Sequence, residues 1–199
     1  MRRRGGPADD DAAVIESSWR EPERFSVLFD RHAPHIYRYL ARRAGRQVAD
    51  DLVAETFLVA FAKRDRYDLG HADARPWLYG IATNLVGQHR RDEARQYRIS
   101  QAVAAEPEVP GHAERVAADV TAQAMRPLLD TALAALPAGD RDVLLLIAWE
   151  QLTYQEVSRA LAIPVGTVRS RLHRARTKVR EVLAGTDAAA TYKEITTNE

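Results

Sequence analysis

Apolar residues recur at three- and four-residue steps along this chain, and no stretch clearly indicates a β-strand. The pattern is clearest in IPVGTVRSRLHRARTKVREVL, residues 163–183. Its apolar members are Val165, Val168, Leu172, Ala175, Val179 and Val182. Such spacing places these side chains on one face of a helix. Because similar steps recur in the segments that begin at Phe25, Ala49, Trp77 and Leu128, the sequence predicts an all-α fold.

The same segment carries six cations between Ile163 and Arg180 and no acid, in a chain whose formal net charge is +1. A nearly neutral protein gathers cations in this way where a polyanion or an acidic partner meets them. A solvated basic helix face is the alternative that these residues alone leave open. The cations are Arg169, Arg171, Arg174, Arg176, Lys178 and Arg180.

Composition excludes several classes of function. The chain has no cysteine, which rules out disulfides, thiolate catalysis and cysteine-ligated zinc. His32 and His35 form the only close histidine pair and are interpreted as surface or packing residues. Without a phosphate-binding glycine loop, a nucleophile motif or metal-ligand spacing, we expect no enzyme activity, no cofactor and no metal. No run of about 18 apolar residues and no signal peptide is present, so we expect no membrane insertion and a cytoplasmic location.

Changes in composition divide the chain into five segments. Residues 1–20 combine an arginine run, glycines and an aspartate run, which predicts a disordered tail. Residues 21–98 are expected to form a first helical domain, and the acidic segment 99–125, which contains prolines, is expected to be a linker. Residues 126–184 form a second helical domain before a tail at 185–199. The sequence therefore predicts two small helical domains joined by a flexible linker.

Local signals place the breaks between helices. The tetrad Thr153-Tyr154-Gln155-Glu156 has the form of a capping box and opens a helix that runs to about Leu161. The basic helix follows after a turn of a few residues, so the two form a helix-turn-helix. In the first domain, Pro34 is expected to start a new turn or to kink its helix, because proline lacks the amide hydrogen.

Two parts of the sequence resemble a known family. The stretch YQEVSRALAIPVGTVRSRLHRAR is similar to the C-terminal DNA-reading domain of sigma-70-type factors, and ADDLVAETFLVAFAK with RPWLYGIATNL resembles their N-terminal core domain. With both in this order, the chain resembles the short group called extracytoplasmic-function (ECF) sigma factors from about Phe25 to Leu183. The resemblance implies an alternative sigma factor that directs bacterial core RNA polymerase to specific promoters and assists promoter melting. A stand-alone helix-turn-helix regulator is the alternative.

The resemblance also implies protein partners. An acidic helix face would dock on the beta-prime coiled-coil of the polymerase, with the beta flap as a further contact, and an anti-sigma factor would cover these surfaces. Asp51 and Glu55 lie one turn apart, opposite the apolar stripe of their helix, and Asp50 is a further candidate. Asp50 and Asp51 would also favour the helix amino terminus through its dipole, which is the plainer interpretation. Many relatives carry glutamine where this chain has Ala54, so one polar contact is expected to be missing.

For the minus-ten promoter element, the resemblance implies capture of an extruded base by the loop Asp65–Ala74 and the helix that follows it. Trp77 could stack on such a base, but we favour a place in the core, because it shares helical spacing with Leu78 and Ile81. The residues expected to bind DNA here are Asn84 through a base, Gln88 on the same face as Asn84, and Arg90, Arg91 and Arg95 through phosphates.

For the minus-thirty-five element, the first turns of the basic helix are expected to enter the major groove. Arginine there binds guanine through two hydrogen bonds. The candidates are Arg169 and Arg171 for base edges, Thr167 and Ser170 for bases or phosphates, and His173 and Arg174 for the DNA backbone.

Overall fold

The computed structural model describes residues 10–103 and 120–184, and side chains over 10–100 and 127–184. Within these ranges the chain forms helices and connecting turns without a strand, which confirms the all-α prediction. The helices are α1 (Asp11–Ser17), α2 (Ser26–Ala44), α3 (Arg46–Ala62), α4 (Arg75–Val103), α5 (Val120–Ala134), α6 (Ala138–Ala148), α7 (Tyr154–Leu161) and α8 (Val165–Ala184), with short 3-10 turns η1 (Pro22–Phe25) and η2 (Arg64–Arg66). The chain divides into two compact units, one built on α1–α4 and the other on α5–α8.

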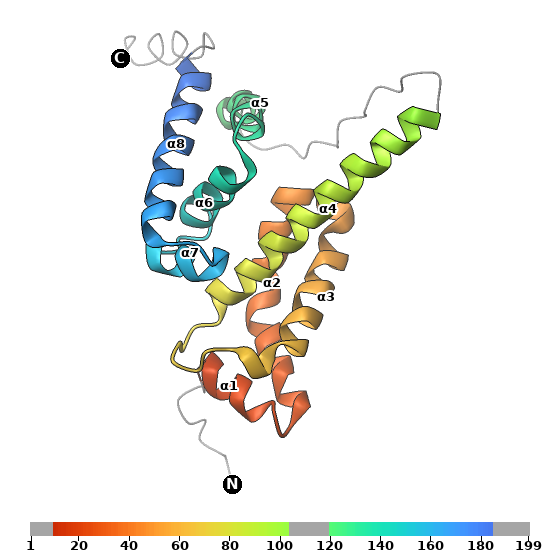
Figure 1. The fold of residues 1–199 in the computed structure, drawn as a ribbon, viewed down its shortest axis with the longest axis vertical. Coiled ribbons are helices and arrows are strands. Elements are labelled where there is room, and N and C mark those ends of the chain that lie inside the picture. Colours follow the sequence, from red (N-terminus) through yellow and green to blue (C-terminus); the bar gives the residue numbers. More distant parts are fainter. Residues whose placement is uncertain (1–9, 104–119, 185–199) are drawn as a thin grey trace. The chain divides into compact units, whose positions relative to one another are not determined.

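In the first unit α2, α3 and α4 pack on one another around a shared core (Figure 1). The rings of Tyr39 and Tyr79 meet edge to face with centroids 5.3 Å apart, and the Tyr39 hydroxyl shares a 2.7 Å hydrogen bond with that of Thr83. These contacts hold one face of α4 against α2, so its opposite face points outward. The buried side chains are Leu28, Ile36, Tyr39, Leu40, Ala49, Leu52, Val53, Phe57, Ala60, Leu78, Tyr79, Ala82 and Val86.

Helix α2 continues through Pro34, so the new turn that was one of the two expected outcomes does not start there. Pro34 and Asp30 are both exposed, so water can bind the Asp30 carbonyl that would otherwise accept the missing amide hydrogen. The turn to α3 comes at Gly45 instead, whose φ of 89° lies in the region that glycine adopts readily.

The prediction of a disordered tail is wrong for residues 10–20. Asp10 caps helix α1 by accepting a 2.8 Å hydrogen bond from the Ala13 amide. Val14 and Ile15 are buried, so this short helix has an apolar side that joins the core of the first unit. The aspartate run was the reason for predicting disorder, but one of its members, Asp10, is the N-cap of α1. Residues 1–9 lie outside the described part of the chain.

The predicted linker is also too long at both ends. Helix α4 runs to Val103 and helix α5 begins at Val120, so residues 99–103 and 120–125 are helical. Both stretches lack glycine and proline, and nothing in them ends a helix. Residues 104–119, and the C-terminal tail 185–199, lie outside the described residues.

In the second unit α8 packs against α5 and α6. The predicted capping box before α7 is confirmed: the Thr153 amide donates to the Glu156 carboxylate at 2.7 Å, and the Glu156 amide donates to the Thr153 hydroxyl at 3.3 Å. After α7, Ser158 donates a 2.6 Å hydrogen bond to the Ile163 carbonyl, which closes the turn into α8. The predicted helix-turn-helix is therefore formed by α7 and α8.

Candidate nucleic-acid interface

Helix α8 presents its cations in two rows. Val168, Leu172 and Ala175 are buried, which determines the outward side of the helix. One row follows steps of four, three and four residues and is exposed throughout. It consists of Arg169, His173, Arg176 and Arg180. Arg176 belongs to this row by its spacing of seven from Arg169, a signal in the sequence that our choice of site residues missed.

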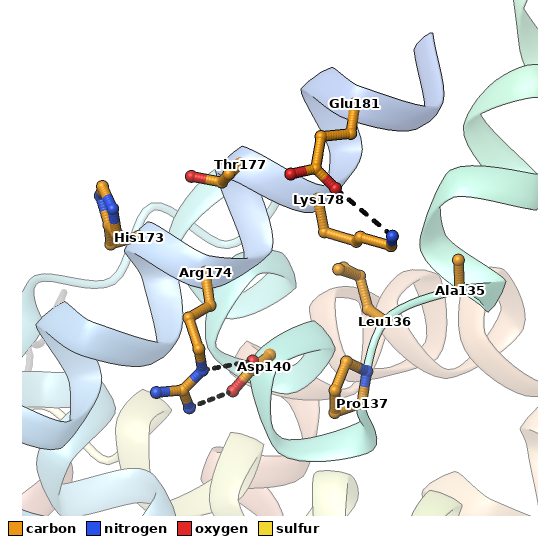
Figure 2. Close-up of a pocket in the computed structure, with 9 residues that line it drawn as sticks. All are labelled: Ala135, Leu136, Pro137, Asp140, His173, Arg174, Thr177, Lys178 and Glu181. Atoms are coloured by element: carbon orange, nitrogen blue, oxygen red, sulfur yellow. Dashed lines mark hydrogen bonds and ion pairs between the residues drawn. The ribbon is translucent and has the colours of Figure 1, made fainter. Parts of the chain in front are cut away.

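The second row faces α6. Arg174 donates two hydrogen bonds to the buried Asp140 carboxylate, from Nε at 3.0 Å and from Nη2 at 2.9 Å (Figure 2). Arg171 lies half-buried over Gly139, with its Nη1 only 2.6 Å from where a β-carbon on that glycine would stand. Of the six predicted minus-thirty-five residues, Arg169, Ser170, His173 and Arg174 are exposed, although Arg174 is bonded to Asp140 of α6, and Arg171 is half-buried against the first turn of α6. Thr167 is half-buried.

Asp140 links α8 to α6, so its loss should weaken the second unit. Asp140→Asn is expected to lower the free energy of unfolding by about 1 kcal/mol, because one charge-assisted hydrogen bond is lost while the exposed arginine keeps its solvation. Thermal unfolding followed by Trp149 fluorescence measures the change. Asp130→Asn, the same change at an exposed position of α5, is the matched control and should have no effect. Equal stability of the two variants would contradict the prediction.

Beside this ion pair, the α5–α6 turn and α8 line an open hollow of about 480 Å³ (Figure 2). Its apolar side comes from Ala135, Leu136 and Pro137. Its polar side comes from α8, where Lys178 and Glu181 form a 3.3 Å ion pair. Lys178 thus lines this hollow and lies outside the row through Arg169, although its side chain is exposed.

On α4, the predicted DNA-binding residues also separate into two groups. Asn84, Gln88, Arg91 and Arg95 follow steps of four, three and four residues and are all exposed, so they form one continuous row. Arg90 lies elsewhere: it donates a hydrogen bond to the Arg43 carbonyl in the last turn of α2. Its guanidinium therefore ties α4 to α2.

The assignment of Trp77 to the core is wrong. Leu78, Tyr79, Ala82 and Val86 form the buried row, and Trp77 is only half-buried. It precedes Asn84 by seven residues, or two turns, and therefore lies on the same side of α4. Its ring packs on Tyr67 of the preceding loop, with centroids 5.0 Å apart. An aromatic ring thus joins the exposed row of α4 to the loop Asp65–Ala74.

That loop is closed by Tyr67. Its hydroxyl donates to the His71 carbonyl at 2.6 Å and lies 3.2 Å from the Asp73 carbonyl. Burial raises the pKa of the Tyr67 hydroxyl, and the negative charges of Asp11 and Asp73 raise it further, so the donor proton stays in place. The Asp68 side chain accepts from the Gly70 amide at 2.9 Å and makes the tight turn within the loop.

Asp11 of α1 is buried beside the end of this loop. Burial by itself would raise the pKa of its carboxyl, but hydrogen bonds from His32, the Ala74 amide and Arg31, with the charge of His32, outweigh that effect. They hold the pKa at about 2, below the ordinary 3.8. His32, interpreted from the sequence as a surface or packing residue, is a buried partner of this carboxylate at 2.8 Å.

Asp11→Asn is expected to lower the free energy of unfolding of the first unit by about 2 kcal/mol at neutral pH. A depressed pKa in the folded chain stabilises it fully above the unfolded value of 3.8, and this stabilisation is lost as the pH falls toward 2. The gap between wild type and variant should therefore shrink steadily in acid. Urea unfolding, followed by Trp19 and Trp77 fluorescence in a Trp149→Phe background, measures it. A gap independent of pH would contradict the assignment.

Helix α3 carries the predicted acidic face. Asp50, Asp51 and Glu55 are all exposed. Leu58 lies on the same side, seven residues after Asp51, and is 68% exposed. Leu58 belongs neither to the predicted apolar stripe nor to the predicted site residues, although its spacing from Asp51 places it on the acidic face.

The described ranges, 10–103 and 120–184, contain neither a metal-ligand cluster nor a membrane-spanning helix. No cluster of three or more histidine, aspartate or glutamate side chains there has the arrangement of a metal site. Among the helices of those ranges, none combines the length and apolarity needed to cross a membrane.

Comparison with known families gives two matches. Residues 28–96 match the family described as Sigma-70 region 2, and residues 126–179 match Sigma-70, region 4. The first match contains the acidic face of α3 and the exposed row of α4. The second contains α7 and α8.

Similar proteins extend across both matches. The ECF RNA polymerase sigma factor SigE of Mycolicibacterium smegmatis is 35% identical over 88% of this chain, which spans 64% of that protein. The RNA polymerase sigma factor CarQ of Myxococcus xanthus is 34% identical over 81% of this chain and 90% of its own length. A solved structure of the sigma factor RpoE with the anti-sigma factor NepR, from Bartonella quintana, is 25% identical with a TM-score of 0.59, covering 80% of this chain and 96% of that one. All three relatives are sigma factors, a class of protein that is not enzymatic.

Proposed function

This chain belongs to the extracytoplasmic-function sigma factors of the sigma-70 family, and from that premise we propose that it is an alternative sigma factor. It directs bacterial core RNA polymerase to specific promoters, recognises a minus-ten and a minus-thirty-five element, and helps to open the DNA. The polymerase performs the catalysis, so the chain itself is no enzyme. The observation that carries the proposal is that one chain holds both sigma-70 regions, each with an exposed row of DNA-binding residue types on one helix.

The acidic face of α3 binds the polymerase. Asp51 and Glu55 pair with cations on the beta-prime coiled-coil, and Asp50 adds charge at the edge of the face. Leu58 supplies apolar contact area on the same side of α3, about one turn after Glu55. The alanine at position 54 leaves room between Asp51 and Glu55 without a polar contact of its own.

The row on α4 and the loop Asp65–Ala74 bind the minus-ten element. Asn84 and Gln88 offer amides that bind base edges, while Arg91 and Arg95 extend the row along the phosphates. Trp77 and Tyr67 hold the loop beside the start of this row, where an extruded base has both donors and an aromatic surface nearby. Arg90 positions α4 on α2 through the Arg43 carbonyl and contributes positive charge to the phosphates.

The exposed row on α8 binds the minus-thirty-five element. Arg169, in the second turn of α8, reaches a base edge, and Ser170 and Thr167 bind bases or phosphates near it. His173 and Arg176 follow along the DNA backbone. Arg171 and Arg174 lie against α6, so they contribute to the positive field and steady the helix more than they read bases.

Regulation comes from a protein partner. The sigma factor RpoE of Bartonella quintana was solved with an anti-sigma factor, and an anti-sigma factor of this chain would cover its polymerase-binding surfaces. Since the polymerase works in the cytoplasm, so does this chain, together with the beta flap and beta-prime subunits that it contacts.

The test of the proposed function is transcription on fragmented genomic DNA with core polymerase, with and without the chain. The expected result is discrete start sites that share two spaced upstream elements and that vanish when the chain is omitted. A stand-alone helix-turn-helix regulator would instead bind a specific site tightly without polymerase, usually with two-fold symmetry. Specific binding by the chain alone, without new start sites, would favour that alternative.

A further inference from the structure

The amino-terminal end of α1 is bonded to the end of the loop Asp65–Ala74. The Asp11 amide donates to the Ala72 carbonyl at 3.0 Å, and the Ala74 amide donates back to the Asp11 carboxylate at 2.9 Å. Asp11 thus donates one hydrogen bond to the segment just before α4 and accepts another from it. These bonds hold the last part of the loop in one backbone conformation.

The carboxylate that makes this contact is itself held by α2. Arg31 donates to Asp11 Oδ1 at 3.0 Å, and His32 lies 2.8 Å from Oδ2, the same oxygen that the Ala74 amide binds. Asp11 and His32 are 6% and 8% exposed, so water competes little for these bonds. Through Asp11, the end of the loop is therefore fixed relative to α2, a helix that contributes to the core of the unit.

The carboxyl-terminal end of α1 is bonded to the start of the same loop. The Trp19 indole donates from Nε1 to the Arg64 carbonyl at 3.2 Å, and Arg64 Nε donates to the Ser18 carbonyl at 3.4 Å. The Arg64 guanidinium also lies 3.9 Å from the centre of the Phe61 ring. Helix α1 thus contacts the chain just before the loop and again at its end.

The loop has few apolar anchors of its own. Tyr67 and Ala74 are its only buried residues, and most of the others are exposed. A loop with so little burial is held mainly by its hydrogen bonds. We propose that helix α1 is a strap that holds the loop Asp65–Ala74 in the shape that captures the minus-ten base, and that Asp11 is its principal positioning residue. This inference rests on the proposed function, since it concerns the loop assigned to base capture.

The experiment uses holoenzyme assembled from core polymerase and full-length chain, on a promoter found by the transcription test. Asp11→Asn keeps the size of the side chain and removes its charge. The expected result is an opening rate about tenfold slower on duplex promoter, measured by permanganate reactivity of unpaired thymines, because the loop no longer holds its conformation. A promoter already melted at the minus-ten element should restore the signal. Discrimination among single-base changes in the minus-ten element should fall, and discrimination in the minus-thirty-five element should not.

Two more variants make the result specific. Glu16→Gln is the matched control, because it makes the same chemical change at an exposed position of α1, and it should behave as wild type. Trp19→Phe removes only the indole donor at the other end of the strap and should slow opening about threefold, with the same rescue by melted DNA. If Asp11→Asn is unfolded at the assay temperature, Trp19→Phe decides the question.

The outcomes separate this inference from the proposed function. A wild-type holoenzyme that opens no promoter overturns the proposed function, and the inference with it. If the wild type opens the promoter and the Asp11→Asn chain opens it equally fast, the inference alone is overturned. Two other results also overturn the inference alone: an Asp11→Asn chain that is equally slow on duplex and melted DNA, and one that loses discrimination in both promoter elements. Either result indicates a general loss of folding or of core binding.

Discussion

A chain carrying Asp51→Arg and Glu55→Arg is expected to lose at least about a hundredfold in affinity for core RNA polymerase while keeping its helical content. Both carboxylates are exposed and lie one turn apart on α3, with the exposed Leu58 beside them. Reversed charges would repel the cations that the acidic face meets, and the apolar contact at Leu58 would be lost with them. Fluorescence anisotropy of labelled chain, titrated with core polymerase, measures the affinity, and circular dichroism measures the helical content.

The matched control for this pair is Glu16→Arg with Glu23→Arg, which makes the same change of charge at exposed positions of α1 and η1. Its affinity for core polymerase should stay within about twofold of wild type, since only general attraction between the proteins is altered. Affinity that falls equally in both double variants would show that net charge, rather than the face on α3, governs binding. Unchanged affinity in the α3 variant would remove the docking assignment.

Arg169→Ala is expected to relax minus-thirty-five discrimination by about 1–3 kcal/mol, or roughly fivefold to 150-fold, while general affinity for DNA falls less. Arg169 is exposed near the start of α8 and lies in the outward row, so its guanidinium is available to a guanine in the major groove. Holoenzyme binding to promoters with single-base changes in that element measures the discrimination.

Arg180→Ala is the matched variant for Arg169→Ala, because it removes the same side chain from the same row three turns later. It should weaken binding about equally on every sequence and reduce the dependence of affinity on salt, as a phosphate contact does. If Arg169→Ala also loses affinity equally on every sequence, Arg169 is a phosphate contact and base reading lies elsewhere on the row.

Local signals were sufficient for much of the fold. The apolar steps predicted α3 and α8, the Thr153 tetrad predicted the start of α7, and the acids of α3 were expected on an exposed face, as observed. Each of these features depends on residues within a few turns of one another, which a single sequence displays directly. Helix α1 was not predicted, because Asp11 stabilises it through hydrogen bonds with Arg31, His32 and Ala74, which are distant in the sequence.

The composition of the candidate site was predicted better than its orientation. The exposed row of α4 holds the predicted Asn84, Gln88, Arg91 and Arg95, but Arg90 turned out to bond to α2. Spacing shows which residues share a face, whereas neighbouring helices decide which face is covered. For the same reason Arg171 was found half-buried against α6, and the exposed Arg174 was found bonded to Asp140 of α6.

By itself, the sequence determined that this protein is a pair of helical regions with an acidic helix and a basic helix, because helical periodicity and charge are local properties of the chain. Only the tertiary structure decided that α1 straps the loop before α4, through an Asp11 carboxylate and an Ala74 amide that are 63 residues apart. It also decided which arginines of α8 point outward. Both results depend on buried hydrogen bonds and packing between distant segments, whose partners the spacing of residues along the chain does not specify.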